Sequence, residues 1–123
     1  MKLFGKAKPE HLQKGDQAEQ QALVYLKQQG LHWLCSNFRC KAGELDLVMR
    51  DKEALVIVEV RFRKSEQFGG ALASITPQKQ ARIVAATQHY VIINHMSHCA
   101  IRFDVVAIAG DGNVHWIKNA FQT

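Results

Sequence analysis

Two neighbouring strand-forming segments, separated by a short turn, constrain the fold of this chain most strongly. In GELDLVMR, residues 43–50, side chains alternate: Leu45, Leu47 and Met49 are expected on one face of a strand, and Glu44, Asp46 and Val48 on the other. The second segment, ALVIVEVRFR at 54–63, is rich in β-branched residues, as a strand buried on both faces would be. The pair predicts an antiparallel hairpin whose second strand lies inside a sheet.

Helix signals flank this hairpin. Pro9 and Gly30 bound a helical stripe, and Thr76 with Pro77 predicts a helix cap and a helix to about Val91. We further expect a short apolar run at 31–35, a turn around Ser36 and Asn37, a loop at 64–74, and strands at 101–109 and 114–118. The order α-β-β-β-α-β-β predicts one α/β domain over residues 1–123, with an ordered core of about 9–118.

Composition restricts the cellular setting and the partners. Lys and Arg number 16 against 11 acidic residues, a net charge of +5, which favours polyanionic partners such as nucleic acid. The three cysteines do not form a disulfide framework, and neither a signal peptide nor a run of ~18 apolar residues is present. We therefore expect a cytoplasmic protein without a membrane span.

Three carboxylates occupy positions where apolar residues are expected: Glu19 on the first helix, Asp46 on the first hairpin strand and Glu59 on the second. Each has an ordinary explanation taken alone, because Glu19 could pair with an arginine, Asp46 could face water, and Glu59 could bridge to Arg61 or Arg63. Burying several carboxylates together is costly, and a divalent cation is the simplest way to hold them.

The hairpin register decides whether two of these acids meet. A loop of two residues (Lys52–Glu53) or four (51–54) makes Asp46 oppose Glu59. Arg61 and Arg63 then project from the same face as Glu59. A metal beside a cation suits phosphodiester hydrolysis, because one polarises a phosphoryl oxygen and activates water while the other balances developing charge.

The run G43-E44-x-D46 followed by V58-E59-V60-R61-x-R63 resembles the acidic-acidic-basic motif of restriction-endonuclease-like nucleases. From about Gly15 to Ile108 the chain resembles the bacterial YraN family, which is similar to archaeal Holliday junction resolvases. The match includes G15-x-x-x-E19-x-x-A22, F68-G69, K79 and R102-F103-D104. The resemblance implies a restriction-endonuclease-like fold with a mixed sheet flanked by helices.

The resemblance also implies roles for individual residues. Asp46 and Glu59 would bind Mg²⁺ or Mn²⁺, Glu19 would be a ligand or hold a metal-bound water, and Glu44 would support them. Arg61 stands where nucleases of this class usually have a lysine; it can stabilise charge but cannot act as a base. Arg63 and Lys79 would assist, and Lys79 could supply the missing ammonium or be a solvated helix residue.

The implied function is metal-dependent hydrolysis of structured or branched DNA. The alternative is a DNA-binding protein that keeps the nuclease fold but not the reaction, and Arg61 is the feature that favours it. A protein-interaction scaffold is a third reading. Related resolvases act as dimers, because a four-way junction offers two equivalent scissile sites, so analogy implies a homodimer.

Overall fold

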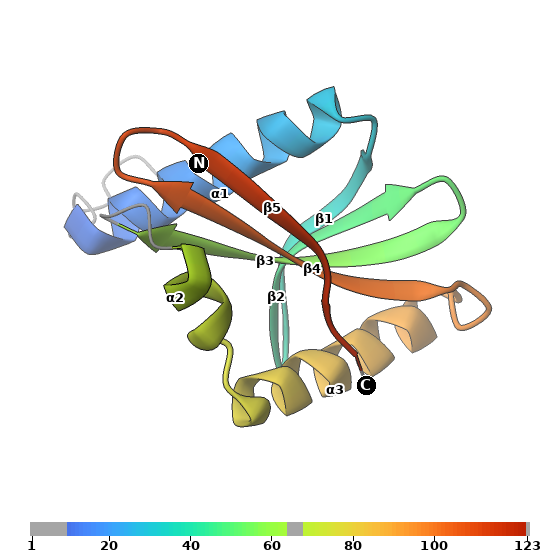
Figure 1. Ribbon diagram of the computed structural model, residues 1–123. Helices are drawn as coiled ribbons and strands as arrows, with labels where there is room; N and C mark the ends of the chain where they lie inside the picture. The colour runs from blue at the N-terminus through green and yellow to red at the C-terminus, as the bar shows by residue number, and fades with distance from the viewer. Residues whose placement is uncertain (1–9, 64–67, 123) are drawn as a thin grey trace, which may run out of the picture.

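A five-stranded mixed sheet forms the centre of the computed structural model, which describes residues 10–63 and 68–122 (Figure 1). Its strands follow each other in chain order, and all neighbours are antiparallel except β3 and β4, which are parallel. The strands are β1 (His32–Cys40), β2 (Gly43–Asp51), β3 (Ala54–Arg63), β4 (Ile101–Ala109) and β5 (Val114–Phe121). The predicted mixed α/β sheet is confirmed.

The β2–β3 hairpin has the register that the sequence predicts. Asp51 pairs with Ala54, so the loop is the two-residue alternative, Lys52–Glu53. Lys52 has a φ of 56°, the left-handed conformation that tight hairpin turns require. Because β3 then pairs with β4 as well, its apolar run is buried on both faces.

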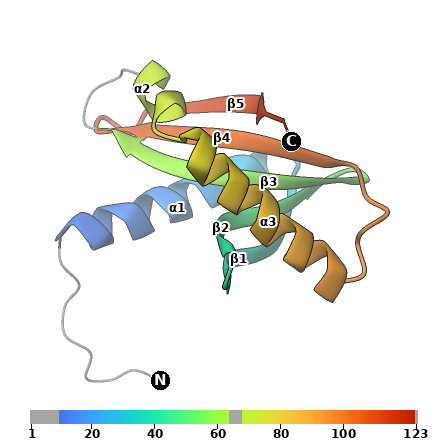
Figure 2. The same cartoon turned by 90° about the horizontal axis from the view of Figure 1, so that it is seen from below.

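The two long helices cover opposite faces of the sheet (Figures 1 and 2). Helix α1 (Glu10–Gln28) packs Ala18, Ala22 and Leu26 against one face. Helix α3 (Pro77–Ile93) packs against the other face, through Ile83, Ala86, Tyr90 and Val91 among others. The predicted cap is present, because the side chain of Thr76 accepts a hydrogen bond from the backbone N–H of Lys79.

Two local predictions were wrong. The turn expected at Ser36 and Asn37 is not there: β1 continues to Cys40, and Asn37 takes a φ of 55° within the strand, which asparagine tolerates better than most residues. The loop expected at 64–74 contains a short helix, α2 (Phe68–Ala73), while positions 64–67 lie outside the described residues. Gly69 and Gly70 suggest a loop, but both fall inside this helix.

The predicted alternation along β2 holds for part of the strand only. Leu47 and Met49 pack with α1, as one face requires, whereas Leu45 packs in the α3 cluster together with Val48. The strand therefore changes its facing between Leu45 and Leu47, at Asp46. None of the described helices is both long enough and apolar enough to cross a membrane.

Candidate active site at the Asp46–Glu59 pair

Asp46 and Glu59 face each other one step beyond Leu47 and Val58, the last pair in register between β2 and β3. The backbone N–H of Asp46 donates to Oε2 of Glu59 at 3.5 Å. The backbone N–H of Val60 donates to Oδ2 of Asp46 at 2.9 Å. The carboxylates thus replace the regular ladder where the strands separate, and they lie together as the sequence predicts.

The guanidinium of Arg61 lies beside both carboxylates. Its Nη1 lies 3.6 Å from Oδ2 of Asp46, and its Nη2 lies 3.7 Å from Oε1 of Glu59. The guanidinium is fixed by two further hydrogen bonds, because Nη1 donates to the Val60 carbonyl at 2.9 Å and Nε to Oγ of Ser74 at 3.2 Å. The basic residue of the motif therefore lies beside the acids in a held orientation.

Burial disfavours the ionised form of both carboxylates. Only 9% of Asp46 and 5% of Glu59 is exposed to solvent. Desolvation, followed by repulsion from Asp46, raises the pKa of Glu59 to about 8, although Arg61 opposes this shift. Desolvation also raises the pKa of Asp46, against the hydrogen bond from Val60. Buried acids with raised pKa values beside a specific charged partner are enriched at functional sites.

Glu59 and Arg61 open into a hollow of about 340 Å³ between the sheet and the start of α3. We call it the basic hollow, because four of its lining residues are cationic. It is lined by Arg39, Cys40, Gly43, Glu44, Glu59, Arg61, Lys79, Arg82 and Ile83. A cationic wall around a carboxylate floor suits a phosphodiester, whose negative charge the wall would balance.

Glu19 is not in this hollow. It lies on α1, on the other side of the sheet, and lines a separate hollow of about 310 Å³ with Asn37 and Leu47 among others. Desolvation, followed by repulsion from Asp46, raises the pKa of Glu19 to about 7, and a hydrogen bond from Asn37 partly offsets this. Asp46 thus acts electrostatically on Glu19 and on Glu59, from a position where the strand changes face.

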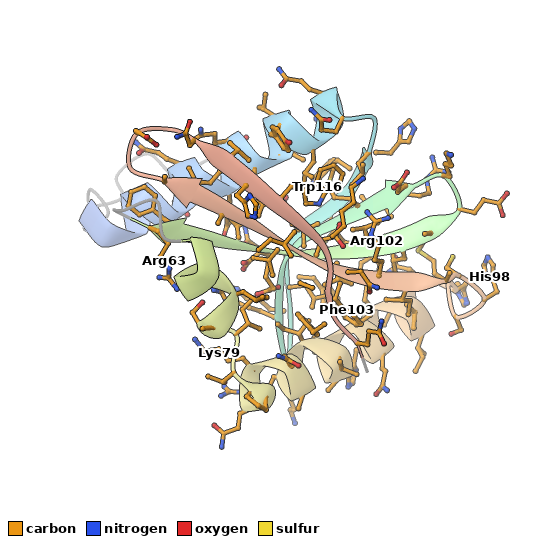
Figure 3. The ribbon with its side chains drawn as sticks, viewed as in Figure 1. Arg63, Lys79, His98, Arg102, Phe103 and Trp116 are labelled. Atoms are coloured by element: carbon orange, nitrogen blue, oxygen red, sulfur yellow. The ribbon has the colours of Figure 1, made fainter. Side chains whose placement is uncertain are left out.

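The three supporting residues are placed differently from one another. Glu44 is exposed and pairs with Arg39, whose Nε lies 3.8 Å from its Oε1. Lys79 lines the basic hollow from the first turn of α3. Arg63 instead turns to α2, where its Nη2 donates to the Gly70 carbonyl at 3.2 Å. Figure 3 shows Arg63 and Lys79 on the same side of the molecule, with α2 between them.

Sequence reasoning missed Arg39, Ser74 and Arg82. Arg82 follows Lys79 by one helical turn, so helix periodicity could have placed both on one face. Arg39 faces Glu44 across β1 and β2, which the misplaced turn at Asn37 concealed. Ser74 lies between two helices, and no local pattern marks it.

The acid pair can be compared with the ligand sets that divalent cations take in proteins. Among residues 10–63 and 68–122 no three His, Cys, Asp or Glu side chains come together as a cation site. Mg²⁺, however, commonly takes one or two carboxylates and completes its shell with water and substrate phosphates. The Asp46–Glu59 pair fits that type of site, and Glu19 lines the separate hollow on α1 within the electrostatic influence of Asp46.

Comparison with known proteins places the chain in a family. The model of the family described as "Uncharacterised protein family UPF0102" matches residues 18–108. A UPF0102 protein of Nitrosococcus oceani is 47% identical over 116 residues, covering 91% of this chain and 94% of the relative. One of Saccharophagus degradans is 51% identical over 112 residues, covering 90% and 94%. One of Legionella pneumophila is 50% identical over 111 residues, covering 89% and 94%. The chain therefore belongs to the UPF0102 family, the YraN family that its acidic motif resembles.

Proposed function

We propose that this protein is a metal-dependent endonuclease that hydrolyses phosphodiester bonds in structured or branched DNA. The observation that carries the proposal is the buried Asp46–Glu59 pair, whose two carboxylates face each other and whose Glu59 lines a hollow with a cationic wall. Two carboxylates with raised pKa values beside the held guanidinium of Arg61 favour metal-assisted hydrolysis over a purely structural role.

Asp46 and Glu59 would hold Mg²⁺ or Mn²⁺. When bound, the ion supplies Lewis-acid polarisation of a phosphoryl oxygen and lowers the pKa of a bound water. Arg61 remains protonated, so it orients the phosphate and balances developing charge but removes no proton. The anchors on Ser74 and Val60 keep the guanidinium in position for this role.

A DNA-binding protein without hydrolysis is the second candidate, and one observation favours it. The Arg61 guanidinium lies within 3.7 Å of both acids, where it already balances their charge. An arginine in that position competes with a divalent cation for the same oxygens. In this reading the basic hollow binds the DNA backbone and the acid pair limits which phosphates approach.

Cleavage assays separate the two candidates. Labelled four-way junction, flap and linear duplex DNA would be incubated with the protein in Mn²⁺, in Mg²⁺ and in EDTA. We expect slow nicking of branched DNA that needs the metal and is lost in Asp46→Asn and Glu59→Gln. Glu53→Gln, an exposed acid in the hairpin turn, is the matched control and should cut like the wild type. Binding without nicking under every metal condition would establish the second candidate instead.

Dimer formation follows from the proposed substrate by analogy only. A junction presents two symmetric strands, and a homodimer would bring one Asp46–Glu59 pair to each. Sedimentation of the free protein and of its junction complex would show whether two copies bind one junction.

A further inference from the structure

Lys79 and Arg82 form a cationic pair on the first turns of α3. They are one helical turn apart, both are exposed, and both line the basic hollow. Arg61 and Arg102 are held by carboxylates within 4 Å, but no ion pair among the described residues includes Lys79 or Arg82. Their charge is therefore available to an anion that enters the hollow.

The start of α3 adds to this positive charge. Helices usually place acidic side chains in the first turn, where the partial charge of the free N–H groups is positive. Helix α3 has no acid there and has Lys79 instead. Lys79 raises the positive electrostatic potential at this helix end further. This charge destabilises the helix when no anion is bound, and it stabilises a bound phosphate.

The backbone that carries the cationic pair packs closely against β2. A Cβ atom on Gly43 would lie 3.0 Å from the carbonyl oxygen of Arg82, so β2 and α3 approach each other closely at a position that favours glycine. Gly43 begins the strand that presents Asp46. The helical backbone of Arg82 therefore lies beside the strand that carries the acid, as a subsite next to the acid pair requires.

We propose that Lys79 and Arg82 form a second phosphate subsite, which binds the phosphodiester next to the one held at Asp46 and Glu59. The subsite deepens the proposed function, on which it rests, since it assumes that a DNA strand passes Glu59. Its ligand is the sugar–phosphate backbone, so it contributes affinity and register without reading bases. A strand bound there runs from the acid floor of the basic hollow along the start of α3.

The salt dependence of DNA binding tests the subsite without cleavage. Anisotropy titrations of labelled junction DNA in EDTA, at several salt concentrations, would compare the wild type with Lys79→Gln/Arg82→Gln. Each lost phosphate contact lowers the slope of log K against log[salt] by roughly 0.7–0.9, so the double variant should lose about 1.5. Lys79→Arg/Arg82→Lys keeps both charges and should keep the wild-type slope.

Arg50→Gln/Lys52→Gln is the matched control, because it removes equal charge at the hairpin end of the sheet, outside the basic hollow. Its slope should equal that of the wild type. Equal slope losses in the two neutralised pairs, or none in either, would overturn the subsite. Circular dichroism and a thermal melt establish that each variant is folded, and the single Lys79→Gln, with an expected loss of about 0.8, repeats the test with one exposed substitution.

Cleavage is scored separately in the same proteins. Metal-dependent nicking that Glu59→Gln abolishes, together with unchanged slopes, would refute the subsite and leave the nuclease proposal standing. A shallower slope only in Lys79→Gln/Arg82→Gln, without nicking by the wild type, would support the subsite and refute catalysis.

Discussion

The backbone N–H of Val60 donates a 2.9 Å hydrogen bond to Oδ2 of Asp46, across the point where β2 and β3 leave their regular pairing. The carboxylate of Asp46 here accepts a backbone N–H hydrogen bond from the neighbouring strand, as a backbone carbonyl oxygen does elsewhere in the sheet. The acid pair is thus built into the sheet rather than carried on a loop, which fixes its geometry. It also brings two poorly solvated carboxylates together, so the site lowers the free energy of unfolding.

Glu59→Gln should therefore stabilise the protein while removing its proposed activity. At pH 8 the wild type must hold a buried carboxylate whose pKa is raised to about 8, whereas glutamine is neutral. We expect a gain on the order of 2–4 kcal/mol in the free energy of unfolding, measured by urea titration at pH 8. A loss of stability in Glu59→Gln would show that the carboxylate is held by compensating contacts.

Stability of the wild type should fall as pH rises. The pKa values of Glu59 and Glu19 are raised in the folded state to about 8 and about 7, from an ordinary 4.5, so the folded chain keeps protons that the unfolded chain releases. The free energy of unfolding must then decrease from about pH 4.5 to about pH 8. Urea titrations from pH 5 to pH 8 measure the slope.

Two variants show which carboxylate causes this pH dependence of stability. Glu59→Gln should make the slope shallower, because the contribution of Glu59 is gone while that of Glu19 remains. The exposed Glu53→Gln should leave the slope unchanged. A wild-type stability that rises across this pH window would contradict the raised pKa values.

Local patterns were enough to predict the hairpin and its acid pair. Period-two alternation and a short turn specify the register, and the register alone brings Asp46 to Glu59. Leu45 was assigned to the wrong face, because alternation assumes a straight strand and β2 changes its facing at Asp46.

The rest of the site arises from tertiary packing, which a single sequence does not display. Arg82 reaches the hollow because α3 packs on β2 at Gly43, and Ser74 reaches Arg61 because the chain returns to the sheet after α2. Glu19 on α1 lines a different hollow from Glu59, although the charge of Asp46 raises the pKa values of both.

Gly43→Ala should weaken the packing of α3 on β2. The new methyl group would meet the Arg82 backbone at 3.0 Å, and Gly43 has a φ of 158°, which side chains rarely adopt. Overpacking of this kind destabilises by about 1–3 kcal/mol, which a urea titration detects. Gly15→Ala is the control: a Cβ at Gly15 in α1 meets nothing within 4 Å, so it should stabilise by roughly 0.5–1 kcal/mol. Equal effects of the two substitutions would refute the close contact.

Asp104 has a structural role in the sheet. Its buried carboxylate accepts hydrogen bonds from the Arg102 guanidinium, the Trp116 indole and the Asn119 backbone N–H, all at 2.9 Å. Asp104→Ala leaves Arg102 with Asp51 alone and should lower the free energy of unfolding by about 3–5 kcal/mol. A change below about 1 kcal/mol in a urea titration would show that this network is not important for stability.

The last prediction concerns Arg61, whose guanidinium lies 3.6 Å from Asp46 and 3.7 Å from Glu59. In the proposed enzyme this arginine competes with the divalent cation, so wild-type cleavage should be slow. Lysine has a compact ammonium and cannot make the paired contact with both acids and Ser74. We expect Arg61→Lys to keep the fold, to cut faster and to need less metal for half of its maximal rate.

Initial rates on junction DNA, measured across a Mn²⁺ titration, give both quantities for the wild type, Arg61→Lys and Arg61→Lys/Asp46→Ala. The double variant should be inactive, because Asp46 is one of the two carboxylates that would hold the metal. A well-placed charge at a developing oxyanion is worth about 3 kcal/mol of barrier, so the gain in Arg61→Lys should be up to about 100-fold. A wild-type rate equal to that of Arg61→Lys would show that arginine suffices. Absence of cleavage by all three on junction, flap and linear DNA would leave DNA binding as the function of the basic hollow.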